Sequence, residues 1–200
     1  MAITNGYVTL AEVKAAARIT DSVDDALLET TIEASSRLID GHTERRFYTN
    51  GTETRYYAAD HHYWVDVDDL ASTTITLETS SSVDGNYDQT WASDDFQLEP
   101  HNSIASGLAW PATRIRAIGD YLFPVSRETA VKVTSVFGFG TAVPTAVKQA
   151  CLIQSLRQFK RYDSPLGITF GELGGMRVTR MDPDIEALLR PYRRTVVGAA

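Results

Sequence analysis

Hydrophobic positions repeat with the period of a helix over residues 9–46. Thr9 and Glu12 have the spacing of a capping box, and the residues after them, through Arg18, are strong helix formers. A second, longer helix is predicted over residues 24–46, with apolar side chains along one face. Its predicted core positions are Leu28, Ile32 and Ile39. Only a short acidic break separates the two helices, so we expect them to form a hairpin.

Two further helices are predicted in the last third of the chain. Pro144 stands at a first-turn position, and the segment after it keeps helical spacing to about Asp163. Asp182 and Pro183 provide the cap and first turn of a short helix that ends near Pro191. The core positions expected in the longer of these helices are Val147, Ala150 and Cys151.

Between the helices, residues 47–140 are rich in β-branched and aromatic residues and in turn signals, which is typical of a β module. Candidate strands cover residues 52–58, 62–67, 73–78, 94–100, 113–118 and 130–138, and residues 80–89 predict an exposed hairpin tip. The predicted fold class is therefore α+β. It consists of a small helical bundle, formed by the N-terminal hairpin and a later helix, with an inserted antiparallel β module and a C-terminal arm ending in a short helix.

The chain is expected to divide into four parts: a helical hairpin at 1–46, the inserted β module at 47–140, a core helix at 141–168 and a C-terminal docking arm at 169–200. The arm begins with a glycine-rich stretch that predicts a loop or short β-ribbon. Its end carries apolar and basic side chains, and we expect them to be exposed and to contact another protein. They are Leu188, Leu189, Arg190, Tyr192, Arg193 and Arg194.

The run "DHHYWVDVDD" at 60–69 contains residue types that bind zinc, manganese or iron. As a strand, however, it would point His61 and His62 to opposite faces. His62 and Asp66 would stand about 13 Å apart along one face, too far to chelate one ion. The remaining histidines, His42 and His101, lie in no metal-binding motif. We therefore expect a structural strand with a polar face and no metal site.

Other catalytic signals are weak. "GFGTAV" lacks both phosphate-loop patterns, and no GxSxG elbow or triad spacing is present. Adjacent carboxylates such as Asp68 and Asp69 point apart on a strand. The sequence thus predicts a protein that is not an enzyme and needs no cofactor. A basic, aromatic helix segment, "RQFKRY" at 157–162, leaves duplex DNA binding as a minor alternative.

Charge is distributed unevenly along this chain of 200 residues, whose formal net charge is −7. Residues 1–147 carry 10 Lys+Arg and 21 Asp+Glu, whereas residues 148–200 carry 9 and 5. The net negative charge disfavours general DNA binding. Because the two parts of the chain differ in net charge, we expect them to contact different partners. The N-terminus has no secretory pattern, no apolar run is long enough to span a membrane, and the single cysteine excludes an internal disulfide. We expect no membrane partner.

Two segments resemble the head-to-tail connector (adaptor) family of tailed bacteriophages. The first, "YVTLAEVKAAARITDSVDDALLETTIEASSRLIDGHTERRF", is similar to the family's opening pair of helices at Thr9, Leu10, Glu12, Val13, Lys14, Ile19, Asp25, Leu28, Ile32, Ala34 and Ile39. The second, "GFGTAVPTAVKQACLIQSLRQFKRYDSPLG", is similar to its Val-Pro helix at Pro144, Val147, Lys148, Ala150 and Arg161. The β module is absent from the small all-helical members and looks like that of a larger variant.

The resemblance implies a structural protein of the virion, assembled in the host cytoplasm and located at the head–tail junction. Members form a homo-oligomeric ring, usually a dodecamer, between the portal protein and the stopper (head-completion) protein. The ring prolongs the channel through which genomic DNA passes without sequence-specific binding. The expected portal-docking residues, within 171–194, are Arg177, Arg180, Leu188, Leu189, Tyr192, Arg193 and Arg194. Truncation at Gly171 is expected to abolish portal binding and to leave the fold intact.

Two alternatives remain open at this stage. One is another phage neck, tail-completion or minor capsid protein. The other is a glycan-binding β module, in which Trp64, Trp91 and Trp110 would stack on sugar rings.

Overall fold

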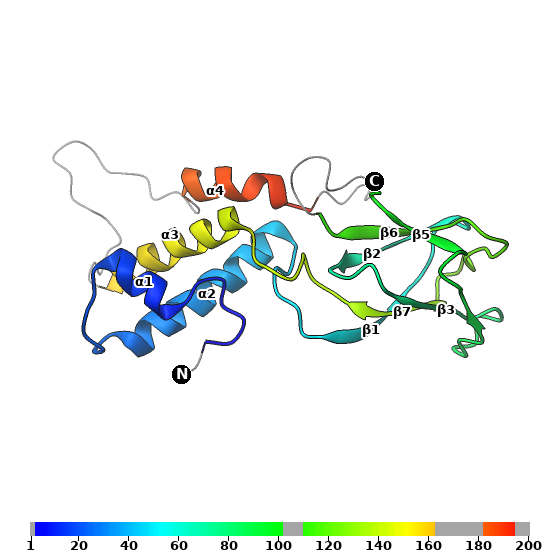
Figure 1. Ribbon diagram of the computed structural model, residues 1–200, viewed down its shortest axis with the longest axis horizontal. Coiled ribbons are helices and arrows are strands. Elements are labelled where there is room, and N and C mark those ends of the chain that lie inside the picture. Colours follow the sequence, from blue (N-terminus) through cyan, green and yellow to red (C-terminus); the bar gives the residue numbers. More distant parts are fainter. Residues whose placement is uncertain (1–2, 102–109, 163–181, 195–200) are drawn as a thin grey trace. The chain divides into compact units, whose positions relative to one another are not determined.

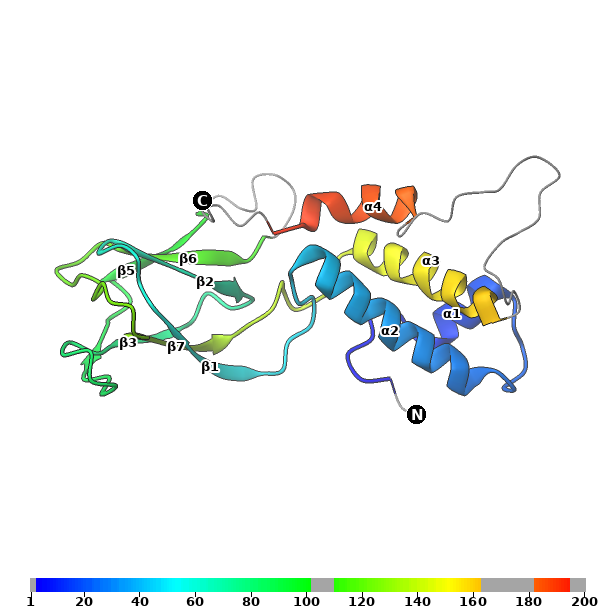
Figure 2. The ribbon, with the colours of Figure 1, turned by 180° about the vertical axis from the view of Figure 1, so that it is seen from behind.

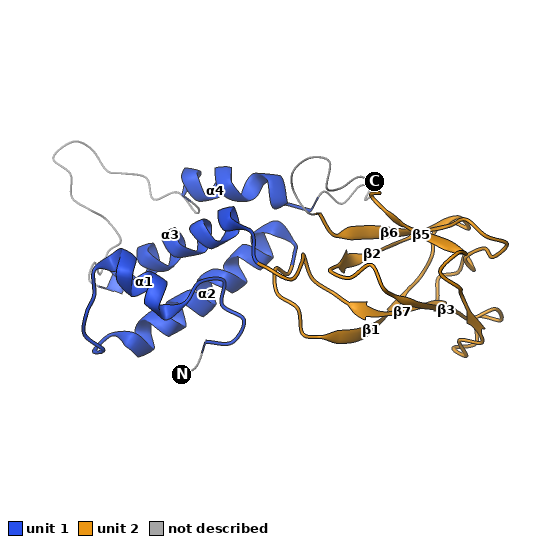
Figure 3. Cartoon of the chain, viewed as in Figure 1, with its two compact units in different colours: residues 1–45, 143–200 blue, residues 46–142 orange. Residues whose placement is uncertain are grey.

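The computed structural model describes residues 3–101, 110–162 and 182–194. These residues form two compact units, one from 1–45 and 143–200 and the other from 46–142 (Figure 3). The first unit is helical and the second is built from antiparallel strands (Figure 1). The predicted α+β class is therefore confirmed. The predicted arm residues 169–181 lie outside the described residues.

The helical unit contains α1 (Leu10–Ala17), α2 (Asp25–Thr43), α3 (Thr145–Tyr162), α4 (Pro183–Leu189) and the 3-10 turn η2 (Arg190–Tyr192). The capping box predicted for α1 is present, because the Thr9 hydroxyl accepts from the Glu12 amide and the Glu12 carboxylate accepts from the Thr9 amide. Asp24 is the N-cap residue of α2, but its side chain makes no capping hydrogen bond. The Asp25 carboxylate instead pairs with Lys14 Nζ at 2.6 Å and so connects α2 to α1.

α3 packs against α2 and against α4. The reverse view in Figure 2 shows α3 between these two helices. The six positions predicted for this core have no exposed surface: Leu28, Ile32, Ile39, Val147, Ala150 and Cys151. Small polar side chains fill the contact between α2 and α3. The Ser36 hydroxyl accepts from the Tyr7 amide and lies 3.4 Å from Cys151 Sγ. Burial raises the pKa of the Cys151 thiol, so this cysteine is a packing residue with little thiolate character.

The described residues of the β unit form seven strands: β1 (Thr52–Tyr57), β2 (Trp64–Leu70), β3 (Thr76–Thr79), β4 (Gln89–Thr90), β5 (Phe96–Glu99), β6 (Ala112–Ala117) and β7 (Val131–Val136). They form two antiparallel sheets, one ordered β1-β7-β3-β4 and the other β2-β6-β5. The two-residue strand β4 was not predicted, because two residues carry no periodic signal. Val65, Val67 and Ile115 of one sheet and Leu77, Val131 and Val133 of the other belong to one buried core.

The start of β2 differs from the sequence prediction. Residues 62 and 63 form a turn, so the strand begins at Trp64 and not at His62. A bridge joins His61 to Trp64, and the His61 ring stacks on the Trp64 indole with centroids 3.5 Å apart. Strict alternation would have placed these two rings on opposite faces. The turn removes that constraint and brings them together.

Gly138 permits the sharp bend after β7 that leads toward α3. Its φ of 138° is in the region that favours glycine, and a Cβ placed there would stand 2.4 Å from the Tyr48 carbonyl oxygen. The path of the backbone therefore accounts for the glycine at this position.

Candidate interaction surfaces

The outer face of the β2-β6-β5 sheet carries alternating charges around one tryptophan. Arg114 Nε lies 2.6 Å from Asp66 Oδ1, and Arg116 Nε lies 2.5 Å from Glu99 Oε1. Both guanidinium groups also lie over the Trp64 ring, at 5.5 and 5.7 Å from its centroid. The register of the strands explains this ladder, because Arg116 stands opposite Trp64 and Arg114 opposite Asp66. Its charges neutralise one another within the sheet.

A second charged network joins the two sheets. Arg55 on β1 pairs with Asp68 on β2 at 2.7 Å and with Glu53 at 2.8 Å. Burial raises the pKa of the Glu53 carboxyl, but hydrogen bonds from Arg55 and Arg46 more than offset that effect, so this pKa lies below its usual value. Burial also raises the pKa of the Tyr57 hydroxyl, which hydrogen-bonds Asp68 at 3.1 Å. These groups hold charge in fixed pairs and have a structural role.

The described residues contain no group of three histidine, cysteine or carboxylate side chains that could hold a metal ion. His61 stacks on Trp64, and His62 Nδ1 lies 3.0 Å from the Phe123 carbonyl oxygen. The two histidines of the "DHH" run thus have separate structural contacts.

The three tryptophans do not form an open platform for sugar rings. Trp91 is 4% exposed and stacks on Phe123 with centroids 4.6 Å apart. Trp64 is covered by His61 and the two arginines, and Trp110 packs edge-on against Phe139. Their surroundings are those of packing residues, which weakens the glycan-binding alternative.

A pocket of about 870 Å³ opens beside β5 in the β unit. Serine, threonine and apolar side chains line it, among them Thr74, Phe96 and Trp110. Among its described lining residues His101 alone has a titratable side chain, and no carboxylate or thiol faces it as a partner. The described lining residues therefore include no acid–base pair of the kind that general acid–base catalysis requires.

Some of the C-terminal residues that were expected to form an exposed docking patch are buried, and others are exposed. The prediction of an exposed apolar patch is wrong for Leu189, which has no exposed surface, and for Tyr192, which is 5% exposed. Leu188 is partly buried, whereas Arg190 and Arg193 are exposed. The Arg194 amide donates to the Thr43 carbonyl at 2.8 Å. Arg177 and Arg180 lie outside the described residues.

The buried residues of α4 also change what a truncation would do. Ile185 and Leu189 are fully buried and α4 packs on α3, so removing everything after Gly171 would expose an apolar face of the helical unit. The expectation that such a truncation leaves the fold intact is therefore not compatible with the structure. Charge reversal at exposed arginines is therefore a better test of portal docking than the truncation.

One basic residue of the segment at the end of α3 forms an ion pair within the helical unit. Arg157 Nη1 lies 3.6 Å from Asp182 Oδ2, next to the start of α4. Lys160, Arg161 and Tyr162 are exposed, and Tyr162 is 63% exposed. Two of these three side chains, those of Lys160 and Arg161, are cationic, whereas affinity for duplex DNA comes mainly from several phosphate contacts by Lys and Arg.

The two units differ in net charge. Residues 46–142 carry 6 Lys+Arg and 13 Asp+Glu, whereas the rest of the chain carries 13 of each. The whole formal charge of −7 is thus that of the β unit. The helices of the described chain include none long and apolar enough to cross a bilayer.

One surface was not predicted from the sequence. The connection between β6 and β7 exposes several large apolar side chains, including Ile118 and Leu122, at 53% and 52%. The signal was present as the short apolar run "DYLFPV", which lies outside every periodic segment. Because loops lie on the surface, an apolar run outside the predicted helices and strands indicates an exposed apolar patch.

Comparison with known proteins finds a family model and solved structures to which this chain is similar. Residues 7–78 match the family model described as "Phage gp6-like head-tail connector protein". The match includes α1, α2, β1 and β2 and ends inside β3, so it extends beyond the helices that carried the first predicted resemblance. The second predicted segment, in α3, lies outside it. No curated protein sequence matches the chain.

Solved structures share the fold over the whole chain. A chain from "Neck of empty GTA particle computed with C6 symmetry" has a TM-score of 0.62 at 18% identity, and one from "Neck of native GTA particle computed with C12 symmetry" has 0.61 at 17%. A third, from "Virion of native gene transfer agent (GTA) particle", has 0.59 at 18%. Each comparison covers 100% of this chain and 96% of the other. The resemblance to the head-to-tail connector family of tailed bacteriophages is thus confirmed, and residues 7–78 are the part of the chain that carries it.

Proposed function

We propose that this chain is a structural, non-catalytic subunit of the neck of a phage-like particle. It would form a ring between the portal protein and the stopper (head-completion) protein and extend the DNA channel at the head–tail junction of the virion. The observation that carries this proposal is that a connector family model and the fold of neck proteins both match this chain. The family match lies over the first helices and strands, and the fold of neck proteins extends over the whole chain, β unit included.

A ring of twelve copies is the proposed assembly. The similar neck structures were computed with C6 and C12 symmetry, which supports a cyclic arrangement. A ring of more than two identical subunits needs two different complementary surfaces on each copy, and a chain with two dissimilar units offers such surfaces.

We propose that the C-terminal stretch docks on the portal. Residues 148–200 carry 9 Lys+Arg against 5 Asp+Glu, and Arg190 and Arg193 are exposed next to α4. The buried Leu189 and Tyr192 would act indirectly, because they fix α4 and η2 on the helical unit and so orient these arginines. The proposed portal-docking residues also include Arg177, Arg180, Leu188 and Arg194.

DNA would pass through the ring without being read. Negative surface charge repels phosphate and keeps a polyanion mobile, and the β unit has a net charge of −7. The β unit is proposed to face the stopper or a neighbouring subunit. Assembly would take place in the host cytoplasm and needs neither a metal nor a cofactor.

Electron microscopy of portal rings incubated with the purified chain tests the proposal. The portal protein is taken from the same phage or prophage. An added layer with twelvefold symmetry on one end of the portal is the expected result. Portal rings that remain bare at saturating concentrations of the folded chain would refute it.

A further inference from the structure

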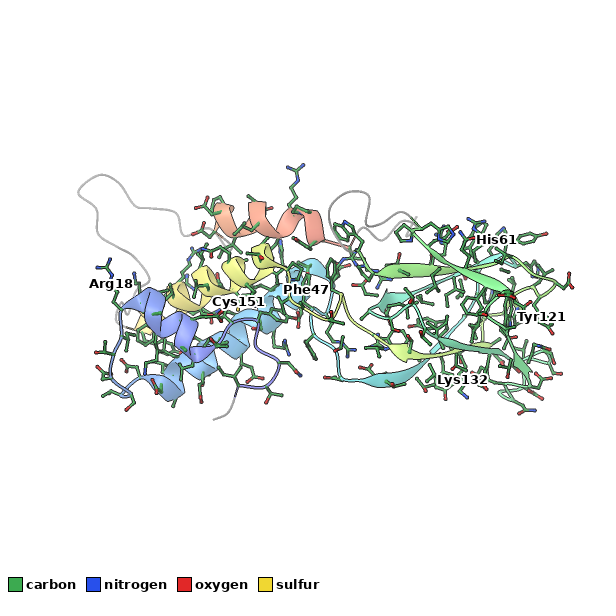
Figure 4. All side chains as sticks on the ribbon, viewed as in Figure 1. Arg18, Phe47, His61, Tyr121, Lys132 and Cys151 are labelled. Atoms are coloured by element: carbon green, nitrogen blue, oxygen red, sulfur yellow. The ribbon has the colours of Figure 1, made fainter. Side chains whose placement is uncertain are left out.

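All the loops at one end of the β unit come together. Val131, at the start of β7, stands opposite the last residues of β1 and β3, Tyr57 and Thr79. In the other sheet, the end of β6 stands opposite the starts of β2 and β5. Residues 58–63, 80–95 and 118–130 therefore share one end, here called the distal end. The chain enters and leaves the unit at the other end, and Figure 4 shows Phe47 and Tyr121 at these opposite ends.

The distal end presents a cluster of apolar side chains to solvent. Nine large apolar side chains are exposed in the described residues, and five of them lie here. They are Tyr63 at 53%, Ile118 at 53%, Tyr121 at 38%, Leu122 at 52% and Val125 at 46%. Such a concentration in one place marks an interaction site, whereas single exposed apolar residues do not.

The connection that carries this cluster is held firmly in place. The amides of Ile118 and Gly119 both donate to the Asp95 carbonyl, at 2.9 and 3.2 Å. The Phe123 amide donates to the His62 carbonyl at 2.8 Å, and the Phe123 ring is fully buried. A Cβ on Gly119 would stand 2.5 Å from Asp95 Oδ1 and 3.0 Å from its Cα. The fold therefore fixes a preformed apolar surface, and a partner need not order the loop in order to bind it.

The loops that carry this cluster are acidic, and their carboxylates are here called its rim. The three distal loops contain a single arginine, Arg127, and the carboxylates Asp60, Asp84, Asp88, Asp94, Asp95, Asp120 and Glu128. The other five Lys and Arg residues of the unit are in ion pairs with Glu53, Asp66, Asp68, Glu78 and Glu99. Apart from Arg127, the positive side chains of the unit are thus paired outside the distal loops, and the net charge of these loops is negative.

We propose that the distal end of the β unit is a docking surface for another protein, one whose contact segment combines apolar side chains with lysine or arginine. Apolar contact at the centre and opposite charge at the rim are the two features that such a segment would complement. The acidic rim excludes DNA and anionic membranes as the occupant, because both carry phosphate.

A second copy of this chain does not meet the description. Two distal ends would repel each other, and the helical unit has no net charge. The positive C-terminal stretch is assigned to the portal, a step that rests on the proposed function. A different protein of the assembled particle is therefore the occupant.

The test uses the full-length chain and three synthetic fourteen-residue helical peptides that differ in one property each. The first combines leucine with lysine, the second leucine with glutamate and the third serine with lysine. Fluorescence anisotropy of the labelled peptides measures their affinities at low and physiological salt. Ile118→Ser/Leu122→Ser removes two side chains of the cluster, and Val23→Ser/Leu38→Ser is the matched control, because it removes two exposed apolar side chains from the helical unit.

Only the leucine–lysine peptide is expected to bind tightly, with an affinity that falls as salt rises. Ile118→Ser/Leu122→Ser should weaken it by about tenfold or more, given the transfer free energy of two apolar side chains, and the control should not. Absence of binding, equal binding to the double variant, or equal binding of the leucine–glutamate peptide would overturn the proposal. Portal binding of the same variants is measured separately, so that a failure of the ring proposal is recognised as such.

Discussion

Arg55 Nη1 and Asp68 Oδ2 lie 2.7 Å apart and connect β1, at the edge of one sheet, to β2, at the edge of the other. The Arg55 guanidinium also lies 4.3 Å from the centroid of Phe137, a fully buried ring. One side chain thus joins the two sheets by charge and by contact with their common core.

Replacement of this arginine should weaken the β unit. Arg55→Met keeps much of the aliphatic stem but leaves Asp68 and Glu53 without their shared partner, and we expect a loss of about 1–2 kcal/mol in the free energy of unfolding. Urea unfolding followed by tryptophan fluorescence measures it. Arg127→Met, at an exposed distal position, should change stability by less than about 0.5 kcal/mol. Equal effects of the two substitutions would contradict the structural role of Arg55.

The same network predicts a dependence of stability on pH. The pKa of Glu53 is lowered in the folded chain, so its contribution is complete above the usual value of 4.5 and is lost as pH falls through the lower folded pKa. Glu53→Gln should therefore be less stable than the parent at pH 7, and the difference should shrink as pH falls below about 4.5. Urea midpoints of both proteins between pH 7 and pH 3.5 test this. A difference that stays constant with pH would show that the charge of Glu53 does not contribute.

Phe123 anchors the distal end. Its ring has no exposed surface and stacks on Trp91, so Phe123→Ala should cost about 3–5 kcal/mol in the free energy of unfolding. Tyr121→Ala removes a neighbouring ring that is 38% exposed and should cost about 1 kcal/mol or less. Thermal or urea unfolding distinguishes them. A small effect at Phe123 would mean that the connection is not held by its buried ring.

Portal docking should depend on exposed arginines at the C-terminal end of the described chain. Arg190→Glu/Arg193→Glu should weaken binding to purified portal by about tenfold or more, because opposite charges across an interface become like charges. Arg127→Glu changes the same kind of exposed residue in the other unit and is the control. Surface-based binding assays at two salt concentrations measure both. Unchanged affinity of the double variant would remove these arginines from the docking site.

The helices were the most predictable part of the fold, because a capping box and the helical spacing of apolar residues are local patterns in the sequence. The Thr9–Glu12 capping box and the burial of Leu28, Ile32 and Cys151 follow directly from helical spacing. The strands were located from their β-branched and aromatic residues. Their pairing order, with β7 between β1 and β3, depends on contacts between distant residues that a periodic pattern does not contain.

The candidate surfaces were less predictable for a related reason. Leu189 and Tyr192 have the composition of an exposed patch, yet both are buried in the helical unit, where α4 packs on α3. His61 and Trp64 stack because a turn interrupts the expected alternation. The distal end is assembled from three loops that are far apart in the sequence, so only the folded chain brings their apolar and acidic residues together.

The most direct test of the proposed neck role is the mass of the purified chain, alone and mixed with the portal of its own phage, by light scattering. The proposal predicts a species of low copy number alone and, with portal, a complex whose added mass corresponds to about one copy of this chain per portal subunit. A chain that remains folded and monomeric in both conditions, with no mass added to the portal, would contradict the proposed role in a ring at the head–tail junction.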